Sequence, residues 1–357
     1  MPIRRFGAGV LRHAGRWAIP ALGLVGARPG PAAVPAAQAG EYAYVTNEEG
    51  RTLTVLDVAT DRVVATIPVG TRPRGVRVGP GGRYVYVALS GSPRCPPTMP
   101  DAECEKLASD RSLDGIAEVD VAARRVRRVL PGGSDPEQFD VSPDGRRLYA
   151  ANEDAGTASV VDVPSGRVVA RVAVGKEPEG VRVSPDGRTV LVTSESGSTV
   201  TRVDARTARV RGRATVDGRP RDLVFTADGT RYYASAELGG TVLLVDTRTD
   251  RVLARVALPT GAKPMGLALA PGGGRLYVAT GRGGTVEVVD TRTRAVVGSV
   301  KVGARPWGIA LAAGGRKLYA ANGPSNDVSV IDTETLRVTG RVPVGALPWG
   351  VAVGPVR

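Results

Sequence analysis

Seven prolines, each at the start of an apolar run, are followed by side chains that differ from one copy to the next. We call these the post-proline residues, and in chain order they are Arg74, Glu137, Glu179, Arg221, Met265, Trp307 and Trp349. Arginine and carboxylates can bind charged groups, and tryptophan beside arginine is typical of binding hot spots. A purely structural position would keep the same residue type in every repeat, whereas this position varies from repeat to repeat. Such variation indicates a recognition surface, so we interpret this set as a candidate binding site. For Met265 we favour simple packing against a neighbouring unit.

Further acidic residues accompany Glu137 and Glu179 in the corresponding loops: Glu153, Asp154, Glu195 and Glu237. They predict an acidic rim on the side of the site away from the tryptophans. A solvated rim without function is the alternative. Carboxylates alone can support lactone hydrolysis or bind calcium, so a carboxylate-based hydrolase or lactonase that uses Glu179 is our alternative to a binding protein.

The first 39 residues differ in composition from the rest of the chain. They carry five arginines and no acidic residue, then a short apolar stretch over residues 17–27 and the small-residue sequence Ala37-Gln38-Ala39. This order is typical of a secretory signal peptide, and the stretch is too short to span a bilayer. We predict a signal peptide over residues 1–39 and a periplasmic or secreted protein without an integral membrane segment. An uncleaved anchor is the alternative.

Histidine chemistry is excluded once the leader is removed, because it contains His13, the only histidine. The mature chain cannot form a Ser-His-Asp or Cys-His catalytic group, an imidazole zinc site or a histidine-ligated haem. The sequence also lacks a Cys-x-x-Cys-His haem motif and a P-loop. We therefore expect no catalytic residues, no metal site and no cofactor.

Two cysteines, Cys95 and Cys104, lie in a proline-rich excursion. Export favours a disulfide between them, with free thiols or a metal pair as alternatives.

A repeat of about 42 residues organises the chain. An aspartate ends an alternating apolar run at intervals of 63, 42, 42, 42, 44 and 42 residues, and the members are Asp57, Asp120, Asp162, Asp204, Asp246, Asp290 and Asp332. The long interval contains both cysteines, so removal of about 21 residues restores the period. Each unit contains four short strand patterns separated by turn residues, as in a propeller blade.

The fold class that follows is all-β: a seven-bladed β-propeller of four-stranded antiparallel blades, with one domain over residues 40–357. An inserted, disulfide-clipped loop is predicted at residues 91–115. After the predicted leader, the mature chain starts in mid-unit at Tyr42 and ends with the missing first strand at Pro348–Val353. We therefore expect the C-terminal strand to complete the N-terminal blade, which closes the ring and protects its edges.

At Tyr44-Val45-Thr46-Asn47 the chain resembles the YVTN family of β-propeller repeat proteins, over residues 42–353. The Ser142-Pro143-Asp144-Gly145 turn matches the hairpin of that family. The segments Pro136-Glu137-Gln138-Phe139 and Pro348-Trp349-Gly350-Val351 resemble exported propellers associated with PQQ-dependent alcohol oxidation. The resemblance implies a place in a periplasmic oxidative pathway, without an assigned catalytic role.

Strand direction alternates within a blade, so the loop before the first strand and the loop between the second and third strands share one face, the top face. The post-proline residues, the acidic rim and the cysteine-containing insert should all meet there, around the central channel. We expect Trp307, Trp349 and Arg74 to form an aromatic-basic patch opposite the acidic residues; tryptophans that merely plug the channel are the alternative.

The function that we predict is a monomeric, non-catalytic scaffold whose top face binds a periplasmic or extracellular protein or a small ligand. Single-stranded nucleic acid binding, by stacking of bases on aromatics beside arginine, is a further alternative. The acidic arc disfavours it.

Overall fold

The computed structural model describes residues 40–94, 99–100, 103 and 106–355. The predicted signal peptide and both cysteines, Cys95 and Cys104, lie outside the described residues. Within the described ranges, no helix has the length and hydropathy needed to cross a membrane.

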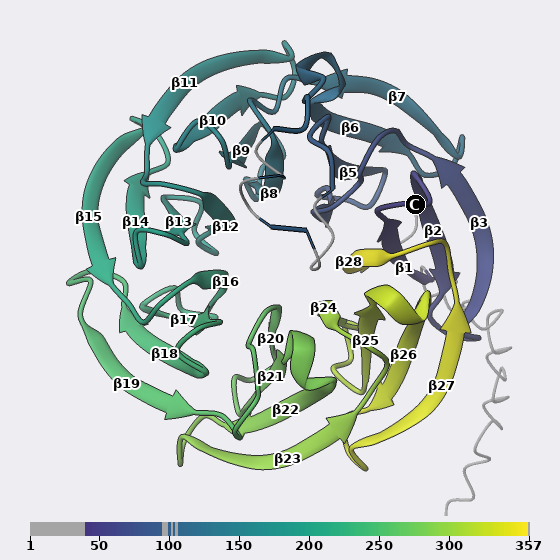
Figure 1. Ribbon diagram of the computed structural model, residues 1–357, viewed down its shortest axis with the longest axis vertical. Helices are drawn as coiled ribbons and strands as arrows, with labels where there is room; N and C mark the ends of the chain where they lie inside the picture. Colours follow the sequence, from purple (N-terminus) through teal and green to yellow (C-terminus); the bar gives the residue numbers. More distant parts are fainter. Residues whose placement is uncertain (1–39, 95–98, 101–102, 104–105, 356–357) are drawn as a thin grey trace, which may run out of the picture. The chain divides into compact units, whose positions relative to one another are not determined.

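Seven four-stranded antiparallel sheets stand in a ring around a central channel (Figure 1). We number the blades along the chain, so that blade 1 has the strand order β28-β1-β2-β3 and blades 2 to 7 contain β4–β7, β8–β11, β12–β15, β16–β19, β20–β23 and β24–β27. This arrangement confirms the fold class expected from the repeat.

The first strand of each blade lines the channel. These inner strands are β4 (Val76–Val78), β8 (Pro136–Val141), β12 (Pro178–Val183), β16 (Pro220–Phe225), β20 (Leu267–Leu269), β24 (Pro306–Leu311) and β28 (Pro348–Pro355). The second strands are β1 (Glu41–Asn47), β5 (Tyr84–Leu89), β9 (Arg147–Asn152), β13 (Thr189–Ser194), β17 (Arg231–Ala236), β21 (Arg275–Ala279) and β25 (Lys317–Asn322).

The third strands end at the repeated aspartates. They are β2 (Thr52–Asp57), β6 (Gly115–Asp120), β10 (Thr157–Asp162), β14 (Thr199–Asp204), β18 (Thr241–Asp246), β22 (Thr285–Asp290) and β26 (Asp327–Asp332). The outer strands are β3 (Arg62–Pro68), β7 (Arg125–Leu130), β11 (Arg167–Ala173), β15 (Arg209–Thr215), β19 (Val252–Ala257), β23 (Ala295–Lys301) and β27 (Arg337–Pro343). Three short 3-10 helices lie in top-face loops: η1 (Arg111–Leu113), η2 (Gly281–Gly283) and η3 (Gly323–Ser325).

Each repeated aspartate fixes the outer hairpin of its blade. The backbone N–H of Thr60 donates to Asp57 Oδ1 at 2.8 Å, and the equivalent bond forms in all seven blades. Such a local bond is the reason that aspartate is favoured at turns. The chain then reverses through a residue with positive φ, such as Asp61 at 57° or Ala208 at 54°.

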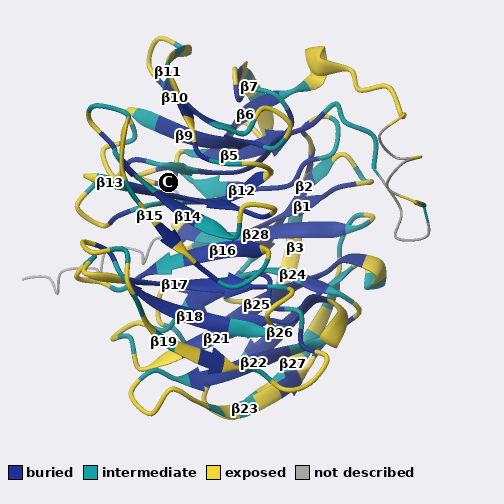
Figure 2. Cartoon of the chain, turned by 60° about the vertical axis from the view of Figure 1, so that its left-hand side comes forward, coloured by how far each residue is buried: buried dark blue, intermediate teal, exposed yellow. Residues whose placement is uncertain are grey.

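The hydrophobic core lies between adjacent blades. Tyr44 and Leu53 of blade 1, for example, pack in one cluster with Val85 and Val87 of blade 2. Buried residues run along the inner and middle strands, whereas exposed residues gather at the hairpins and outer strands (Figure 2). Each fully buried side chain of this size contributes roughly 1.5–3 kcal/mol relative to an exposed one, so every blade depends on its neighbours.

The last strand closes the ring. β28 pairs antiparallel with β1, with Tyr44 opposite Ala352 and Val45 opposite Val351. Blade 1 therefore combines the two ends of the described chain, which confirms the closure that the sequence predicts.

A long excursion, over residues 90–114, separates β5 from β6 on the top face. Its described part is tied to the propeller by Asp114, whose carboxylate accepts hydrogen bonds from the N–H groups of Gly91 at 2.7 Å and Asp135 at 3.0 Å. Arg72 Nη1 also donates to the carbonyl of Ser92 at 2.8 Å. These bonds hold the excursion beside the mouth of the channel.

Deletion of residues 347–357 tests the closure. Without β28, blade 1 loses its inner strand and the flanking blades lose a packing surface, so we expect no cooperative thermal transition in far-ultraviolet circular dichroism. Deletion of Val356 and Arg357 alone, which follow β28, is the control and should leave the melting curve unchanged. A soluble 347–357 deletion with the same melting curve would contradict closure by this strand.

Candidate ligand-binding site

The inner strands of adjacent blades lie so close together that there is no room for a side chain directly after some of the post-proline residues. Glycine occupies this position in five of the seven blades. A Cβ atom on Gly266 would lie 2.4 Å from the carbonyl oxygen of Trp307, and one on Gly350 would lie 2.6 Å from that of Arg74. The Gly266 N–H instead donates to the Trp307 carbonyl at 3.1 Å. The Gly75 N–H bonds in the same way to the Glu137 carbonyl, so the preceding blade holds the backbone of these post-proline residues.

Hydroxyl groups from the second strands reinforce this contact. Thr46 Oγ1 donates to the Arg74 carbonyl at 2.6 Å, and Ser235 Oγ donates to that of Met265 at 2.6 Å. Next to Thr46, Asn47 Nδ2 donates to Thr54 Oγ1 at 2.9 Å. The Thr-Asn pair that carries the family resemblance therefore has a structural role here.

A hollow of about 710 Å³ lies on the top face at the mouth of the channel. Its walls come from the loops of blades 1–5 and 7 and from residues 92–94 and 107–111 of the excursion. Of the post-proline residues, Arg74, Glu137, Trp307 and Trp349 line it. The volume falls within the range of roughly 300–1,000 Å³ that is usual for small-molecule sites.

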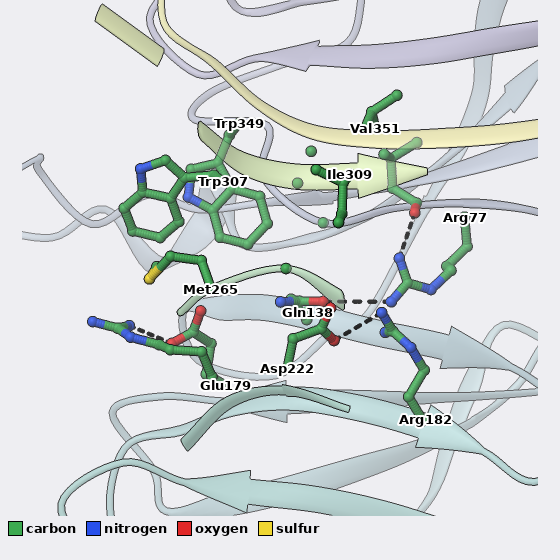
Figure 3. A pocket seen from close by; sticks show the side chains of 16 residues that line it. Arg77, Gln138, Glu179, Arg182, Asp222, Met265, Trp307, Ile309, Trp349 and Val351 are labelled. Atoms are coloured by element: carbon green, nitrogen blue, oxygen red, sulfur yellow. Dashed lines mark hydrogen bonds and ion pairs between the residues drawn. The ribbon is translucent and has the colours of Figure 1, made fainter. Parts of the chain in front are cut away.

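The two tryptophans form one wall of this hollow. The ring centroids of Trp307 and Trp349 are 5.3 Å apart, with an interplanar angle of 36°. Figure 3 shows the two indoles overlapping, with Met265 close to them. Met265 is 5% exposed and packs in a core cluster with Ile309, in agreement with the packing interpretation of that residue.

Arg74, which we expected to form an aromatic-basic patch with the tryptophans, is engaged by carboxylates instead. It follows Trp349 in the ring, but it is 3% exposed, and its guanidinium forms ion pairs with Asp135 and Glu137 of blade 3. Because buried charges must be paired, this arginine is a neutralised part of the wall.

Arg221 of blade 5 is also neutralised by carboxylates, but it lines the narrower cavity below the tryptophans and not the hollow. Its guanidinium bonds to Glu179 and Glu195 and lies 2.7 Å from Glu237 Oε2. Burial raises the pKa of Glu179 well above its usual range, and the adjacent Glu195 adds to the effect. The expected separation of acidic and basic residues is therefore wrong for Arg74, because a contact between blades pairs it with Glu137, which was assigned to the acidic arc.

Glu153 and Asp154 lie at the rim of the hollow in blade 3. Asp154 forms an ion pair with Arg111 of the excursion, and Glu153 Oε2 lies 3.6 Å from Arg74 Nη1. Burial raises the pKa of Glu153 to about 7. The positive charge of Arg74 lowers this pKa, whereas the negative charge of Asp135 raises it further. Glu153 is thus the group of the rim whose charge changes near neutral pH.

Below the tryptophans the channel narrows to a cavity of about 40 Å³. Arg182 Nη2 lies 2.8 Å from Asp222 Oδ1, and Arg77 Nη2 donates to Gln138 Oε1 at 3.4 Å (Figure 3). Burial raises the pKa of Asp222 to about 6. Space of this size holds water rather than an organic molecule, so a ligand would stop at the tryptophans.

A second ring of residues, which we did not identify from the sequence, surrounds the hollow. It consists of the residues before the same prolines: Arg72, Asp135, Glu177, Arg219, Lys263, Arg305 and Leu347. All except Lys263 line the hollow and have φ between 42° and 61°. Left-handed backbone is unfavourable for such residues, especially before proline. The signal was present in the sequence as a charged residue before six of the seven prolines.

No cluster of three or more potential metal-ligating side chains is found within the described ranges. The acidic residues of the hollow are bonded instead to arginines and hydroxyls.

Fold and site together define the class of protein: a seven-bladed β-propeller with a ligand-sized hollow at one mouth of its channel. Within the chain, residues 100–184 match the YNCE-like beta-propeller family. The expected likeness to repeat propellers is thus supported at this coarser level, whereas the link to PQQ-dependent oxidation stays a prediction.

One relative matches over a short segment. Antigen Lp49 of Leptospira interrogans serogroup Icterohaemorrhagiae serovar copenhageni is 28% identical over 109 residues, which is 30% of this chain. The chain therefore spans only 22% of the length of this curated relative.

Solved structures share the whole fold. Hydrazine synthase from Kuenenia stuttgartiensis aligns with a TM-score of 0.70 and 23% identity, over 81% of this chain and 92% of that chain. A proposed 6-phosphogluconolactonase from Bacteroides fragilis aligns with a TM-score of 0.71 and 17% identity, over 88% and 98% of the two chains. At these identities the likeness shows the fold alone.

The raised pKa of Glu153 predicts how stability depends on pH. Because the folded state holds this proton up to about pH 7 while the unfolded chain releases it near pH 4.5, the free energy of unfolding should fall as pH rises through this interval. Glu153→Gln should reduce that fall, as measured by urea unfolding between pH 5 and 8.

Asp162→Asn is the control, because hydrogen bonds from Ser165 lower the pKa of Asp162 and it titrates below this range. A pH dependence that Glu153→Gln leaves unchanged would contradict the assignment.

Proposed function

We propose that this chain is a non-catalytic binding protein that holds a small ligand in the hollow on its top face. The hollow itself is the observation that carries the proposal. Its volume of about 710 Å³ fits a small molecule, and one wall is a pair of tryptophans. Indoles supply a large contact area at a low entropic cost, as expected at a binding hot spot.

The state of the carboxylates favours binding over hydrolysis. A general base must be able to reach the proton that it removes. Glu179, our candidate base for a lactonase, is 2% exposed and is bonded to Arg221, and Glu137 is bonded to the buried Arg74. Both carboxylates are thus engaged by arginines, and Glu179 does not line the hollow.

We further propose that the protein acts outside the cytoplasm, in a periplasmic or extracellular setting that includes an oxidative pathway. This proposal rests on the composition of the leader and on the family resemblance. Sequencing of the N-terminus of protein taken from the periplasmic fraction tests it, and a form that still begins at Met1 in the cytoplasm would oppose it.

Replacement of both Trp307 and Trp349 by alanine tests the binding function. Native mass spectrometry of the full chain purified from its own cell envelope should detect a retained small molecule, and the double variant should lose it because its apolar wall is gone. Leu238→Ala is the control, since Leu238 is a 64% exposed residue outside the hollow.

Retention that is equal in the double variant and the wild type would contradict the proposal. Turnover of a lactone that is lost on Glu179→Gln would also contradict it and would support the hydrolase instead.

A further inference from the structure

Arg305 is the exception among the arginines that line the hollow. The others each form an ion pair with a carboxylate: Arg72, Arg74, Arg94, Arg111 and Arg219. Across the described residues, no carboxylate lies within ion-pair distance of Arg305, and its side chain donates no hydrogen bond to another protein group. A partly enclosed cation therefore faces the hollow without a carboxylate in ion-pair contact, although Glu237 and Glu48 lie near enough to attract it.

The surroundings of Arg305 increase the need for an anion. Burial, together with the like charges of Arg282 and Arg221, lowers the pKa of Arg305, although Glu237 acts in the opposite direction. Arg282 lies in η2 of the neighbouring blade, and it too forms no ion pair with the part of the chain that is described. Positive charge thus accumulates on the blade 6 and blade 7 side of the mouth.

Trp307 fixes the position of this cation. The Arg305 guanidinium carbon lies 4.9 Å from the centroid of the Trp307 ring. Stacking of a guanidinium on an aromatic face uses the flat side of the group and leaves its N–H donors free along the edge. Arg305 can therefore present N–H donors to an anion while its guanidinium lies over the indole.

The same place supplies an apolar surface. Trp307, which Arg305 overlies, and the adjacent Trp349 both line the hollow. An anion without an apolar part would leave the partly exposed Trp307 uncovered, and a neutral apolar molecule would leave the guanidinium unpaired. A molecule that carries both groups satisfies both parts of the wall.

We propose that the hollow binds an organic anion, a carboxylate or phosphate ester attached to a planar apolar group. Its anionic group bonds to the edge of Arg305, and its apolar group packs against Trp307 and Trp349. This inference rests on the proposed binding function and names the chemical class of the ligand.

Emission of the two site tryptophans provides the readout. The chain contains three tryptophans, so Trp17→Phe in the full chain leaves only Trp307 and Trp349. The probes are benzoate and phenyl phosphate, which separate the two sources of negative charge, with benzyl alcohol as the neutral analogue and acetate as the anion without a ring. Benzoate, phenyl phosphate or both should change the emission saturably, and the other two should bind at least about tenfold more weakly.

Arg305→Gln should weaken binding of the anionic probe by about 10-fold to 100-fold, and Arg305→Lys should restore part of it. Arg294→Gln is the matched control. Arg294 also has a positive φ, of 60°, but it lies in the hairpin after β22, on the opposite face, so its loss should not change the affinity. Circular dichroism establishes that each variant is folded.

The anion assignment would be wrong if wild type and Arg305→Gln bound the anionic probe with equal affinity, or if benzoate and benzyl alcohol bound equally. Neither result would contradict the binding function itself. No saturable response to either anionic probe up to about 10 mM would also overturn the assignment. Failure of the binding function itself is detected separately, by the native mass spectrometry of the tryptophan variant.

Discussion

The close approach of the inner strands is the constraint on which the rest of this structure depends. Adjacent strands come near enough for the Gly266 N–H to bond to the carbonyl of Trp307, with no room for a side chain between them. The hydroxyl of Thr46 makes an equivalent contact with the carbonyl of Arg74. These bonds fix the backbone next to the repeated proline in several blades, so the residues around it are held in place at the mouth of the channel.

Charge pairing between blades then determines which of those residues remain available. Arg74 and Arg221 are each surrounded by carboxylates of their own or neighbouring blades. Such buried arginines contribute little net stability, but loss of one partner would cost about 3–5 kcal/mol because a charge would stay buried alone. Most charged residues of the hollow are committed in this way to its architecture. Arg305, which rests on Trp307 instead of a carboxylate, is left for a ligand.

The sequence predicted the architecture well because its signals are local and repeated. The aspartates such as Asp57 mark hairpins that need only a bond to the next turn, and Pro348–Val353 supplied the strand that β1 lacks. The site was predicted only in part. Arg74 and Glu137 are 63 residues apart in sequence, and their pairing depends on side-chain directions that no local pattern specifies. Arg305 was missed because its left-handed backbone before a proline is contrary to ordinary conformational preference.

A crystal structure with 4-bromobenzoate bound would test the central claim most directly, since the anomalous signal of bromine locates the ring independently of the protein. The account predicts a bromine peak in the top-face hollow, with the ring against Trp307 and Trp349 and the carboxylate on the guanidinium of Arg305. A bromobenzoate bound elsewhere on the propeller, or seated in the hollow with its carboxylate away from Arg305, would contradict it.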